Sequence, residues 1–597
     1  MCGIVAVVGE VSGAGVAEAA ARRSAALRHR GPDSAGTHRG ERYVLAHRRL
    51  AILGDASVGA QPCVGEGFAL AYNGEVHNYR ELADRARSRG ATVARGSDVP
   101  LVAGYLAEFG QGARADFDGF FAYVFVDERR RRAYAARDRF GQKPLLFRIE
   151  RDAAGVPARI HFASERAGLP PAGARVRPSA VNDCVQRARY PTAPATFFGD
   201  TRQVRPGELL EIDLDTLELR SHARLREPEG PSVPRERATG APLRGAGVRE
   251  LVRAAVAERL ISDRPVGLLL SAGIDSGLLR VVARPGQVAV NYAFDNGASD
   301  SEYTEAVSGF AGRGQTRRVT LPAGDDAALR QRIATLHHHL DAPLLSASLL
   351  ALDALFAAAA SEGHVVLLSG QGADEVFGGY NYYRGDGAWL VRLAELIRAA
   401  GGGPAAARQL RDRRRAERLL DSLRDGRRGM RATPAPLDFE ARRRYDLLDG
   451  PLADMLWYED RLAMRHGVEV RYPYLDHDVV AYGLSLTWRE LRAGGRPKAA
   501  LVAAFGDQLP AHLRGRQPKR GLPGGESMLL ALHHEVFADG LSSYGTRLDA
   551  DVGPMLRRLR RAVRYPGALG PREARAMFRT ACAGLWLEDI DAGLISE

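Results

Sequence analysis

The stretch Leu268-Leu269-Leu270-Ser271-Ala272-Gly273-Ile274-Asp275-Ser276 combines a short apolar strand, a loop of small residues and the start of a helix. Two further apolar runs, residues 288–292 and 365–368, alternate with long segments rich in Ala, Leu and Arg that are typical of helices. This order of strand, loop, helix and strand predicts a parallel α/β sheet whose ligand lies at the carboxyl ends of the strands. The small-residue loop would let backbone N–H groups surround a phosphate.

The part of the chain before this sheet has a different pattern. Residues 1–148 alternate short apolar runs with turn-rich segments, which predicts many strands, few helices and a β-rich sandwich. Two more strand-like runs end near residue 221, and a Gly- and Pro-rich stretch follows. We therefore expect a first domain over residues 1–222, a linker over 223–246 and a second domain over 247–597, almost entirely helical after residue 385.

Composition narrows the classes of function. The 597 residues carry a net charge of +12, with 45% apolar and 26% charged residues, which is typical of a soluble globular protein. Of the 84 basic residues only Lys143, Lys498 and Lys519 are lysines, a bias typical of a GC-rich genome. The Arg-rich run 408–428 has leucines and acids at helical spacing and no aromatics to stack on bases, so we predict no binding to nucleic acid.

The sequence also predicts where in the cell the protein is located. No uncharged apolar run is long enough to span a membrane, and the N-terminus lacks the basic region and cleavage site of a signal peptide. We predict a cytoplasmic protein without membrane contact.

The cysteines and histidines give one candidate nucleophile. Cys2 would become the first residue once Met1 is removed, and its α-amino group could then accept the thiol proton near neutral pH. For Cys2 alone, a buried inert cysteine remains the alternative. Adjacent helical residues point in different directions, so the run 337–339 of three histidines is predicted to be surface or supporting histidine and not a metal site. The other cysteines, too scattered for a disulfide framework or zinc ribbon, are predicted to be buried apolar side chains: Cys63, Cys184 and Cys582.

Six ordered motifs give the first domain a resemblance to a known family. They are Met1-Cys2-Gly3-Ile4, Arg28-His29-Arg30-Gly31-Pro32-Asp33, His47-Arg48-Arg49-Leu50-Ala51-Ile52, Tyr72-Asn73-Gly74-Glu75-Val76-His77-Asn78-Tyr79, Gly96-Ser97-Asp98 and Arg137-Asp138-Arg139-Phe140-Gly141-Gln142-Lys143-Pro144-Leu145. Together they resemble the class II, N-terminal-nucleophile glutamine amidotransferases, and over the full length the chain resembles the asparagine synthetase family. The resemblance implies a four-layer α/β/β/α glutaminase domain.

The resemblance also implies roles in glutamine hydrolysis. This reaction needs a thiolate, an oxyanion hole and anchors for the α-amino and α-carboxylate groups of the substrate. Cys2 would be the nucleophile, and the Asn73 side-chain amide and the Gly74 backbone N–H would form the oxyanion hole. The implied anchors are Arg49 for the glutamine carboxylate, and Glu75 and Asp98 for its ammonium group.

In the second domain the loop quoted first resembles the pyrophosphate-binding loop of ATP pyrophosphatases, usually written Ser-Gly-Gly-x-Asp-Ser. These enzymes cleave ATP between the α and β phosphates to form an acyl-adenylate. Residues 368–380, LSGQGADEVFGGY, resemble the second signature of the family. The resemblance implies Mg²⁺ binding by Asp275 and Asp374. The ATP-binding residues it implies are Leu269, Ser271, Gly273, Asp275, Ser276, Ser369 and Gly370.

Two positions depart from the family pattern. Ala272 stands where the family usually has Gly, which would cost about 1 kcal/mol if the backbone needs positive φ and otherwise adds only a methyl group. Gln371 stands where glutamine-dependent asparagine synthetases often carry an acid, and an amide cannot accept a proton. Because Gln371 and Asp374 are assigned to the acceptor and intermediate, this departure bears on the acceptor more than on the ligase chemistry.

A third signature, residues 458–477, resembles the helices around the acceptor pocket. The resemblance places the catalytic Lys498 near the leaving pyrophosphate or the tetrahedral intermediate. Lys498 is also one of three lysines left where Arg is general, which favours a position that needs a compact ammonium group. For Lys143 a structural role in its turn is expected.

The predicted activity is therefore amide formation by an ATP- and Mg²⁺-dependent ligase that hydrolyses glutamine and adenylates an acceptor carboxylate. L-Aspartate is the first acceptor considered, and a secondary-metabolite or peptide carboxylate is the alternative. The complete glutaminase set argues against a non-catalytic relative. Because free ammonia would be protonated and lost, an internal channel between docked domains is expected. The predicted partners are small molecules, with a homodimer as the oligomeric state considered; the sequence leaves the acceptor and the use of free ammonia open.

Overall fold

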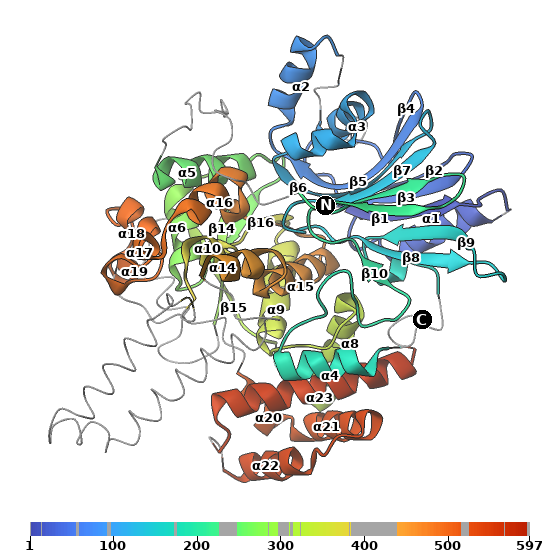
Figure 1. The fold of residues 1–597 in the computed structure, drawn as a ribbon. Coiled ribbons are helices and arrows are strands. Elements are labelled where there is room, and N and C mark those ends of the chain that lie inside the picture. Colours follow the sequence, from blue (N-terminus) through green and yellow to red (C-terminus); the bar gives the residue numbers. More distant parts are fainter. Residues whose placement is uncertain are drawn as a thin grey trace.

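The computed structural model describes residues 2–13, 15–54, 59–91, 93, 97–171, 176–225, 247–284, 286–295, 310, 314–322, 324–380, 383, 439–514, 525–565 and 568–593. The predicted helix over 408–428 and Lys519 lie outside these residues. Figure 1 shows two stacked sheets beside a third, helix-covered sheet, with a layer of helices at the C-terminal end. No helix of the described part is long and apolar enough to cross a membrane.

Two antiparallel sheets form the first part of the fold. One has the strand order β10-β8-β9-β1-β3-β2 and the other β12-β11-β7-β6-β5-β4. Ile4, Ala6 and Val8 of one sheet share a buried core with Ala69 and Ala71 of the other. The strands are β1 (Cys2–Gly9), β2 (Ser34–Arg39), β3 (Tyr43–Arg49), β4 (Cys63–Gly65), β5 (Phe68–Val76), β6 (Gly119–Asp127), β7 (Arg132–Arg137), β8 (Leu146–Arg151), β9 (Pro157–Ala163), β10 (Arg202–Gln203), β11 (Leu209–Asp213) and β12 (Leu219–His222).

Helices cover the outer faces of these sheets. Val5 and Val7, which alternate with the inner residues of β1, pack with Ala20 of α1 (Val16–Ala26). On the other side, α2 (Tyr79–Ser88) and α3 (Asp98–Phe109) contribute to a core with residues of β5 and β6. The predicted four-layer α/β/β/α sandwich is confirmed.

The third sheet is fully parallel. Its order is β15-β14-β13-β16-β17, so the direction of strand addition reverses between β13 and β16, which is where doubly wound folds bind ligands. The predicted doubly wound α/β domain is confirmed, but the prediction of an almost entirely helical region after residue 385 missed β17. The strands are β13 (Val266–Leu269), β14 (Val290–Phe294), β15 (Gln315–Val319), β16 (Val366–Leu368) and β17 (Glu469–Arg471).

Helices surround this sheet and extend beyond it. Those nearest the strands in sequence are α5 (Val248–Arg259), α6 (Ile274–Val282), α8 (Asp326–Leu340), α9 (Ser348–Ser361), α10 (Ala373–Phe377), α14 (Phe439–Leu448), α15 (Pro451–Arg465) and α16 (His477–Ser485). The remaining ones are α17 (Trp488–Leu491), α18 (Ala499–Phe505), α19 (Ala511–Arg514), α20 (Glu526–Leu532), α21 (His534–Leu548), α22 (Gly553–Arg564) and α23 (Pro571–Asp591).

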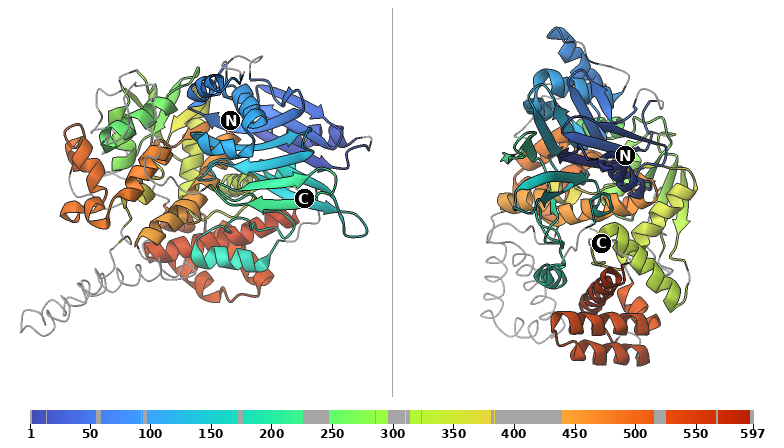
Figure 2. Two further views of the ribbon diagram at one scale, coloured as in Figure 1. Left: turned by 45° about the horizontal axis from the view of Figure 1, so that its top comes forward. Right: turned by 90° about the vertical axis from the view of Figure 1, so that its right-hand side faces the viewer.

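The two halves of the chain share a core. Helix α4 (Pro178–Arg187) lies against α23 at the C-terminal end of the molecule (Figures 1 and 2). Arg579 Nε donates to the Val185 carbonyl at 2.8 Å, and the Phe197 and Trp586 rings lie 5.0 Å apart. A segment preceding residue 222 is thus packed into the second half, and the boundary at 222 stays a prediction.

Two predictions about single residues need correction. Cys184 and Cys582 are buried as expected, but Cys63 is only half-buried, at the short strand β4. Of the two alternatives for the histidine run, surface or supporting, the surface one is wrong for His337, which is fully buried and whose Nδ1 lies 2.8 Å from Asp589 Oδ2 of α23. A histidine in this run can be buried because α8 packs under the C-terminal helices.

Candidate active sites

The first site is built around Cys2 at the start of β1. The side chain is 6% exposed, and the backbone nitrogen of Cys2 donates to Asn73 Oδ1 at 2.9 Å. Burial raises the pKa of the thiol, and the positive amino terminus opposes this shift. Once Met1 is removed, the nitrogen held by Asn73 would be the α-amino group that serves as the base.

Asn73 of β5 contacts this nucleophile, and Gly74 is the next residue of the strand. Because Asn73 Oδ1 accepts from Cys2, its Nδ2 is directed elsewhere, and this buried nitrogen has no partner among the described residues. Gly74 is required by close packing, since a Cβ there would lie 2.1 Å from the Phe120 carbonyl oxygen. A buried amide donor without a partner fits the predicted oxyanion hole.

Two of the predicted glutamine anchors lie around Cys2. Arg49 pairs with Cys2 in the β1–β3 register, is buried, and donates from Nη2 to the Leu53 carbonyl at 3.2 Å. Asp98 opens α3 and accepts from the Tyr72 hydroxyl at 3.0 Å and from the Val76 N–H at 3.2 Å. Burial raises the pKa of the Asp98 carboxyl.

Glu75 lies on the same face of β5 as Asn73 but reaches across to the second half of the chain. Its Oε1 accepts from Arg471 Nη2 at 2.6 Å, and Arg471 Nε also donates to Glu469 at 2.6 Å. Burial raises the pKa of the Glu75 carboxyl, and the charge of Arg471 opposes this shift. The predicted role of Glu75 in holding the glutamine ammonium therefore competes with a link to β17 that the sequence did not predict.

A second buried link joins Cys2 to helix α15. Arg30 Nε donates to the Cys2 carbonyl at 3.1 Å, and Arg30 Nη1 lies 2.9 Å from Asp460 and 2.6 Å from Glu165. Lys143 Nζ lies 3.5 Å from Asp460 of α15, a contact outside its own turn, and the structural role within that turn stays a prediction. Asp460 and Arg471 fall within the third signature, which was the one signal that could have placed them at a functional site.

The buried imidazole of His47 predicts a pH dependence of stability. His47 Nε2 donates to the Tyr72 carbonyl at 2.9 Å, and burial lowers the pKa of His47 to about 3 from 6.5. Below pH 6.5 the unfolded chain binds a proton here that the folded chain excludes, so stability falls by up to about 1.4 kcal/mol per pH unit as the pH is lowered towards 3. The thermal midpoint should drop between pH 6.5 and 5, and His47→Gln should drop less. A His47→Gln slope equal to that of wild type and of the control His38→Gln would contradict this.

The second site lies at the switch point of the parallel sheet. Ser276 Oγ accepts from the Ser271 N–H at 3.0 Å and lies 3.0 Å from Ser271 Oγ, which in turn accepts from the Gly273 N–H at 3.2 Å. These bonds fix the loop between Leu269, the last residue of β13, and α6. Ala272 is not among the non-glycine residues with positive φ, so only its methyl group distinguishes it from Gly.

Lys498 and two carboxylates converge beside this loop. Lys498 Nζ lies 2.5 Å from Asp275 Oδ1 and 2.7 Å from Asp374 Oδ1, and this charge raises the pKa of Lys498. A Cβ on Gly370 would lie 2.9 Å from the Asp275 Cβ, so the loop carrying Ser369 and Gly370 packs directly on α6. Asp275 and Asp374 thus both contact the Lys498 ammonium group, next to the phosphate loop. Two carboxylates beside a phosphate site fit the oxygen ligands that Mg²⁺ binds.

Gln371 contacts a residue that the sequence did not single out. Its Nε2 donates to Glu459 Oε1 of α15 at 2.7 Å, and Ser369 Oγ donates to Glu459 Oε2 at 3.2 Å. Glu459 is 2% exposed. The Glu459 carboxyl group therefore lies beside Gln371, although it belongs to α15 and not to the loop that carries Gln371.

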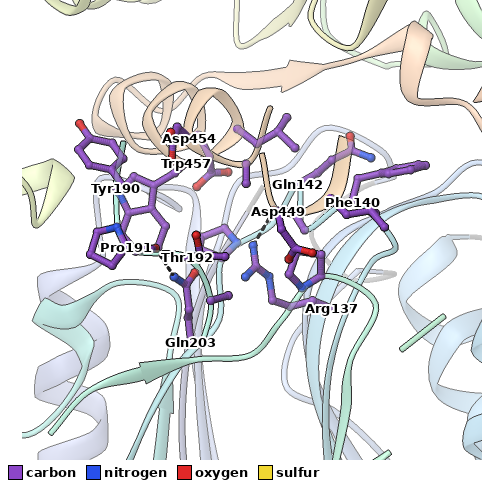
Figure 3. Close-up of a pocket in the computed structure, with 18 of the residues that line it drawn as sticks. Arg137, Phe140, Gln142, Tyr190, Pro191, Thr192, Gln203, Asp449, Asp454 and Trp457 are labelled. Carbon is purple, nitrogen blue, oxygen red and sulfur yellow. Dashed lines mark hydrogen bonds between the residues drawn. The ribbon is translucent and has the colours of Figure 1, made fainter. Parts of the chain in front are cut away.

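A pocket opens where α15 meets the first domain (Figure 3). Asp454 and Trp457 of α15 lie on one side of it, and Arg137 and Gln203 of the first domain on the other. None of the predicted catalytic or substrate-binding residues lines it. It is a feature of the domain seam and separate from both chemical sites.

Fold and sites define a class of protein: a glutaminase of the N-terminal-nucleophile type joined to a parallel α/β domain with a phosphate loop. The family model described as asparagine synthase matches residues 247–587, and the one described as glutamine amidotransferase domain matches residues 1–223. The chain belongs to the asparagine synthase family, and is thus an enzyme of the ligase class that carries out glutamine-dependent amide formation.

Curated relatives match over most of their length. Asparagine synthetase [glutamine-hydrolyzing] 3 of Bacillus subtilis is 26% identical over 574 residues, which are 88% of this chain and 86% of the relative. The protein of the same name from Arabidopsis thaliana is 27% identical over 547 residues, 87% of this chain and 78% of the relative. These names do not favour the alternative of a secondary-metabolite or peptide acceptor.

The similarity of this chain to solved structures is weak. An allosteric regulatory enzyme of purine biosynthesis aligns with 53% of this chain and 80% of its own, at 16% identity and a TM-score of 0.28. This similarity is too low to support a conclusion about the fold or the function of the chain.

Proposed function

We propose that this chain is a glutamine-hydrolysing asparagine synthetase, which converts L-aspartate, L-glutamine and ATP to L-asparagine, L-glutamate, AMP and pyrophosphate. The observation that carries the proposal is that Cys2 with Asn73, and a phosphate loop beside the converging Lys498, Asp275 and Asp374, occur in one chain, with buried contacts from Cys2 through Arg30 to Asp460 of α15. The names of the relatives point to aspartate as the acceptor.

In the first half-reaction the Cys2 thiolate attacks the carboxamide carbon of glutamine. The α-amino group of Cys2, freed by removal of Met1, takes the thiol proton, and Asn73 Nδ2 and the Gly74 N–H stabilise the oxyanion. Arg49 and Asp98 orient the substrate, with Glu75 as the third anchor. Ammonia leaves, and water hydrolyses the thioester to glutamate.

In the second half-reaction a carboxylate oxygen of aspartate attacks the α-phosphorus of ATP, and pyrophosphate leaves. The backbone around Ser271, Gly273 and Ser276 would hold the phosphates, and Lys498 would offset the charge that develops on the leaving group. Asp275 and Asp374 would hold Mg²⁺, which when bound neutralises phosphate charge. Ammonia then attacks the acyl-adenylate, and AMP leaves.

The remaining parts of the proposal concern the whole molecule. Residues 1–222 would act as the glutaminase domain and 247–597 as the synthetase domain, joined by the linker 223–246. Ammonia would pass between them past the buried contacts of α15. We also propose a cytoplasmic enzyme that assembles as a homodimer, which light scattering of the purified protein tests.

The test is the product of the purified enzyme. With ATP, Mg²⁺, glutamine and L-aspartate we expect asparagine, AMP and pyrophosphate in equal amounts. Omission of aspartate should abolish AMP release and pyrophosphate release. Glutamine hydrolysis without asparagine or AMP would contradict the proposed acceptor.

A further inference from the structure

A buried carboxyl group lies beside the position where this chain lacks an acid. Gln371 follows β16 in the loop that leads to Asp374, and its amide cannot accept a proton from an attacking amine. Its Nε2 nevertheless lies 2.7 Å from the Glu459 carboxylate, which also accepts from Ser369. The acid that the loop lacks is supplied by helix α15.

We propose that Glu459 is the general base of the amide-forming step, removing a proton from ammonia as it attacks the acyl-adenylate. This inference rests on the proposed function. In the step, a C–N bond forms between ammonia and the acyl carbon, and Glu459 takes one proton from the nitrogen. The C–O bond to AMP then breaks, its electron pair staying on the AMP phosphate oxygen. The products are the amide, AMP and a protonated Glu459, which returns its proton to solvent.

The position of Glu459 in α15 suits a group that meets ammonia on arrival. The next residue, Asp460, faces the glutaminase site and contacts Arg30, which donates to the Cys2 carbonyl. Glu459 faces the opposite site, where the loop of Ser369 and Gln371 leads to Asp374. One turn of one helix therefore contacts the surroundings of both reacting centres.

The surroundings of Glu459 suit a base that works near neutral pH. No ion pair joins it to a cation of the described chain; its partners are the neutral donors Gln371, Ser369 and Tyr472. Burial raises the pKa of the Tyr458 and Tyr472 phenols, and both lie close enough for the charge of Glu459 to raise it further. On the glutaminase side, the cations Arg30 and Lys143 are paired with the neighbouring Asp460. Burial raises the pKa of Glu459 to about 7, so ionised and protonated forms are both accessible at neutral pH.

The test separates adenylation from amide formation in the full-length enzyme. Adenylation is measured as aspartate-dependent exchange of labelled pyrophosphate into ATP, and amide formation as asparagine released with saturating ammonium chloride. For Glu459→Gln we expect asparagine formation to fall roughly 100- to 1,000-fold, within the range typical of a lost general base, with a far smaller change in exchange. The double variant Glu459→Gln, Gln371→Glu, which moves the acid onto the loop, should recover at least tenfold.

Matched variants keep the result interpretable. Asp454→Asn removes another buried acid of α15, one that faces Arg189, and any loss it causes should be equal in both assays. If Glu459→Gln fails to fold, Glu459→Asp, which withdraws the carboxylate by one methylene, should still lower amide formation about tenfold relative to exchange. The proposal is overturned if asparagine formation stays within twofold of wild type, or if exchange and amide formation fall together. Absent exchange in wild type would instead refute the proposed function.

Discussion

Replacing Cys2 with Ala should abolish amide formation from glutamine while amide formation from ammonium continues. Among the described residues around Cys2 the mechanism uses no second nucleophile: in the proposed function Asn73 and Gly74 stabilise charge, and Arg49 and Asp98 orient the substrate. We expect glutamine hydrolysis to fall on the order of 10⁴-fold or more, since a covalent route has no partial substitute. Asparagine should still form when ammonium chloride replaces glutamine, because Lys498, Asp275 and Asp374 lie in the other site.

The measurement is glutamate and asparagine release with each nitrogen source. Cys63→Ala serves as the matched control, because this half-buried thiol lies on β4, where it pairs with Leu70 at the far end of β5 from Glu75. If Cys2→Ala hydrolyses glutamine at more than a hundredth of the wild-type rate, Cys2 is not the nucleophile. Loss of the ammonium reaction as well would show that the two sites are not separable.

The second large effect is expected at Lys498. Lys498→Gln leaves Asp275 and Asp374 facing each other without the ammonium group that lies 2.5 Å and 2.7 Å from them. We expect adenylation to fall about 100- to 1,000-fold, the range for a lost electrostatic contact to developing charge. Lys498→Arg should also fail, because Gly379 packs so closely that a Cβ there would lie 2.3 Å from the Lys498 Cε.

The aspartate-dependent exchange of labelled pyrophosphate into ATP measures this effect. Unchanged glutamine hydrolysis by the same variant shows that it is folded. As a control, Arg489→Gln removes an exposed positive charge from α17 and should have no effect. Exchange by Lys498→Gln within threefold of wild type would refute the role given to Lys498.

Local motifs predicted the parts of the fold and sites that are local in the chain. The phosphate loop from Ser271 to Ser276 is one continuous segment, and the strands that carry Cys2 and Asn73 begin as short apolar runs between turn-rich segments. Strand β17 was missed because it is three residues long and carries Glu469 and Arg471, both fully buried, where a buried strand is usually apolar. Glu469 and Arg471 pair with each other, and Arg471 also pairs with the distant Glu75.

Contacts between distant segments could not be predicted. Arg471 lies 396 residues from Glu75, and Glu459 lies 88 residues from Gln371. The sequence showed that Gln371 departs from the family pattern. It could not show that Glu459, on a helix far along the chain, lies beside Gln371 in the folded protein. The same holds for α4, whose amphipathic sequence does not reveal that it packs on α23.

Oxygen transfer from the acceptor tests the central claim most directly. Wild-type enzyme is given ATP, Mg²⁺, glutamine and L-aspartate labelled with ¹⁸O in the side-chain carboxylate, and the AMP is analysed by mass spectrometry. If the carboxylate attacks the α-phosphorus and ammonia then displaces AMP, each AMP formed carries one ¹⁸O atom. Unlabelled AMP, or label in inorganic phosphate beside ADP, would contradict an acyl-adenylate and with it the proposed chemistry of this chain.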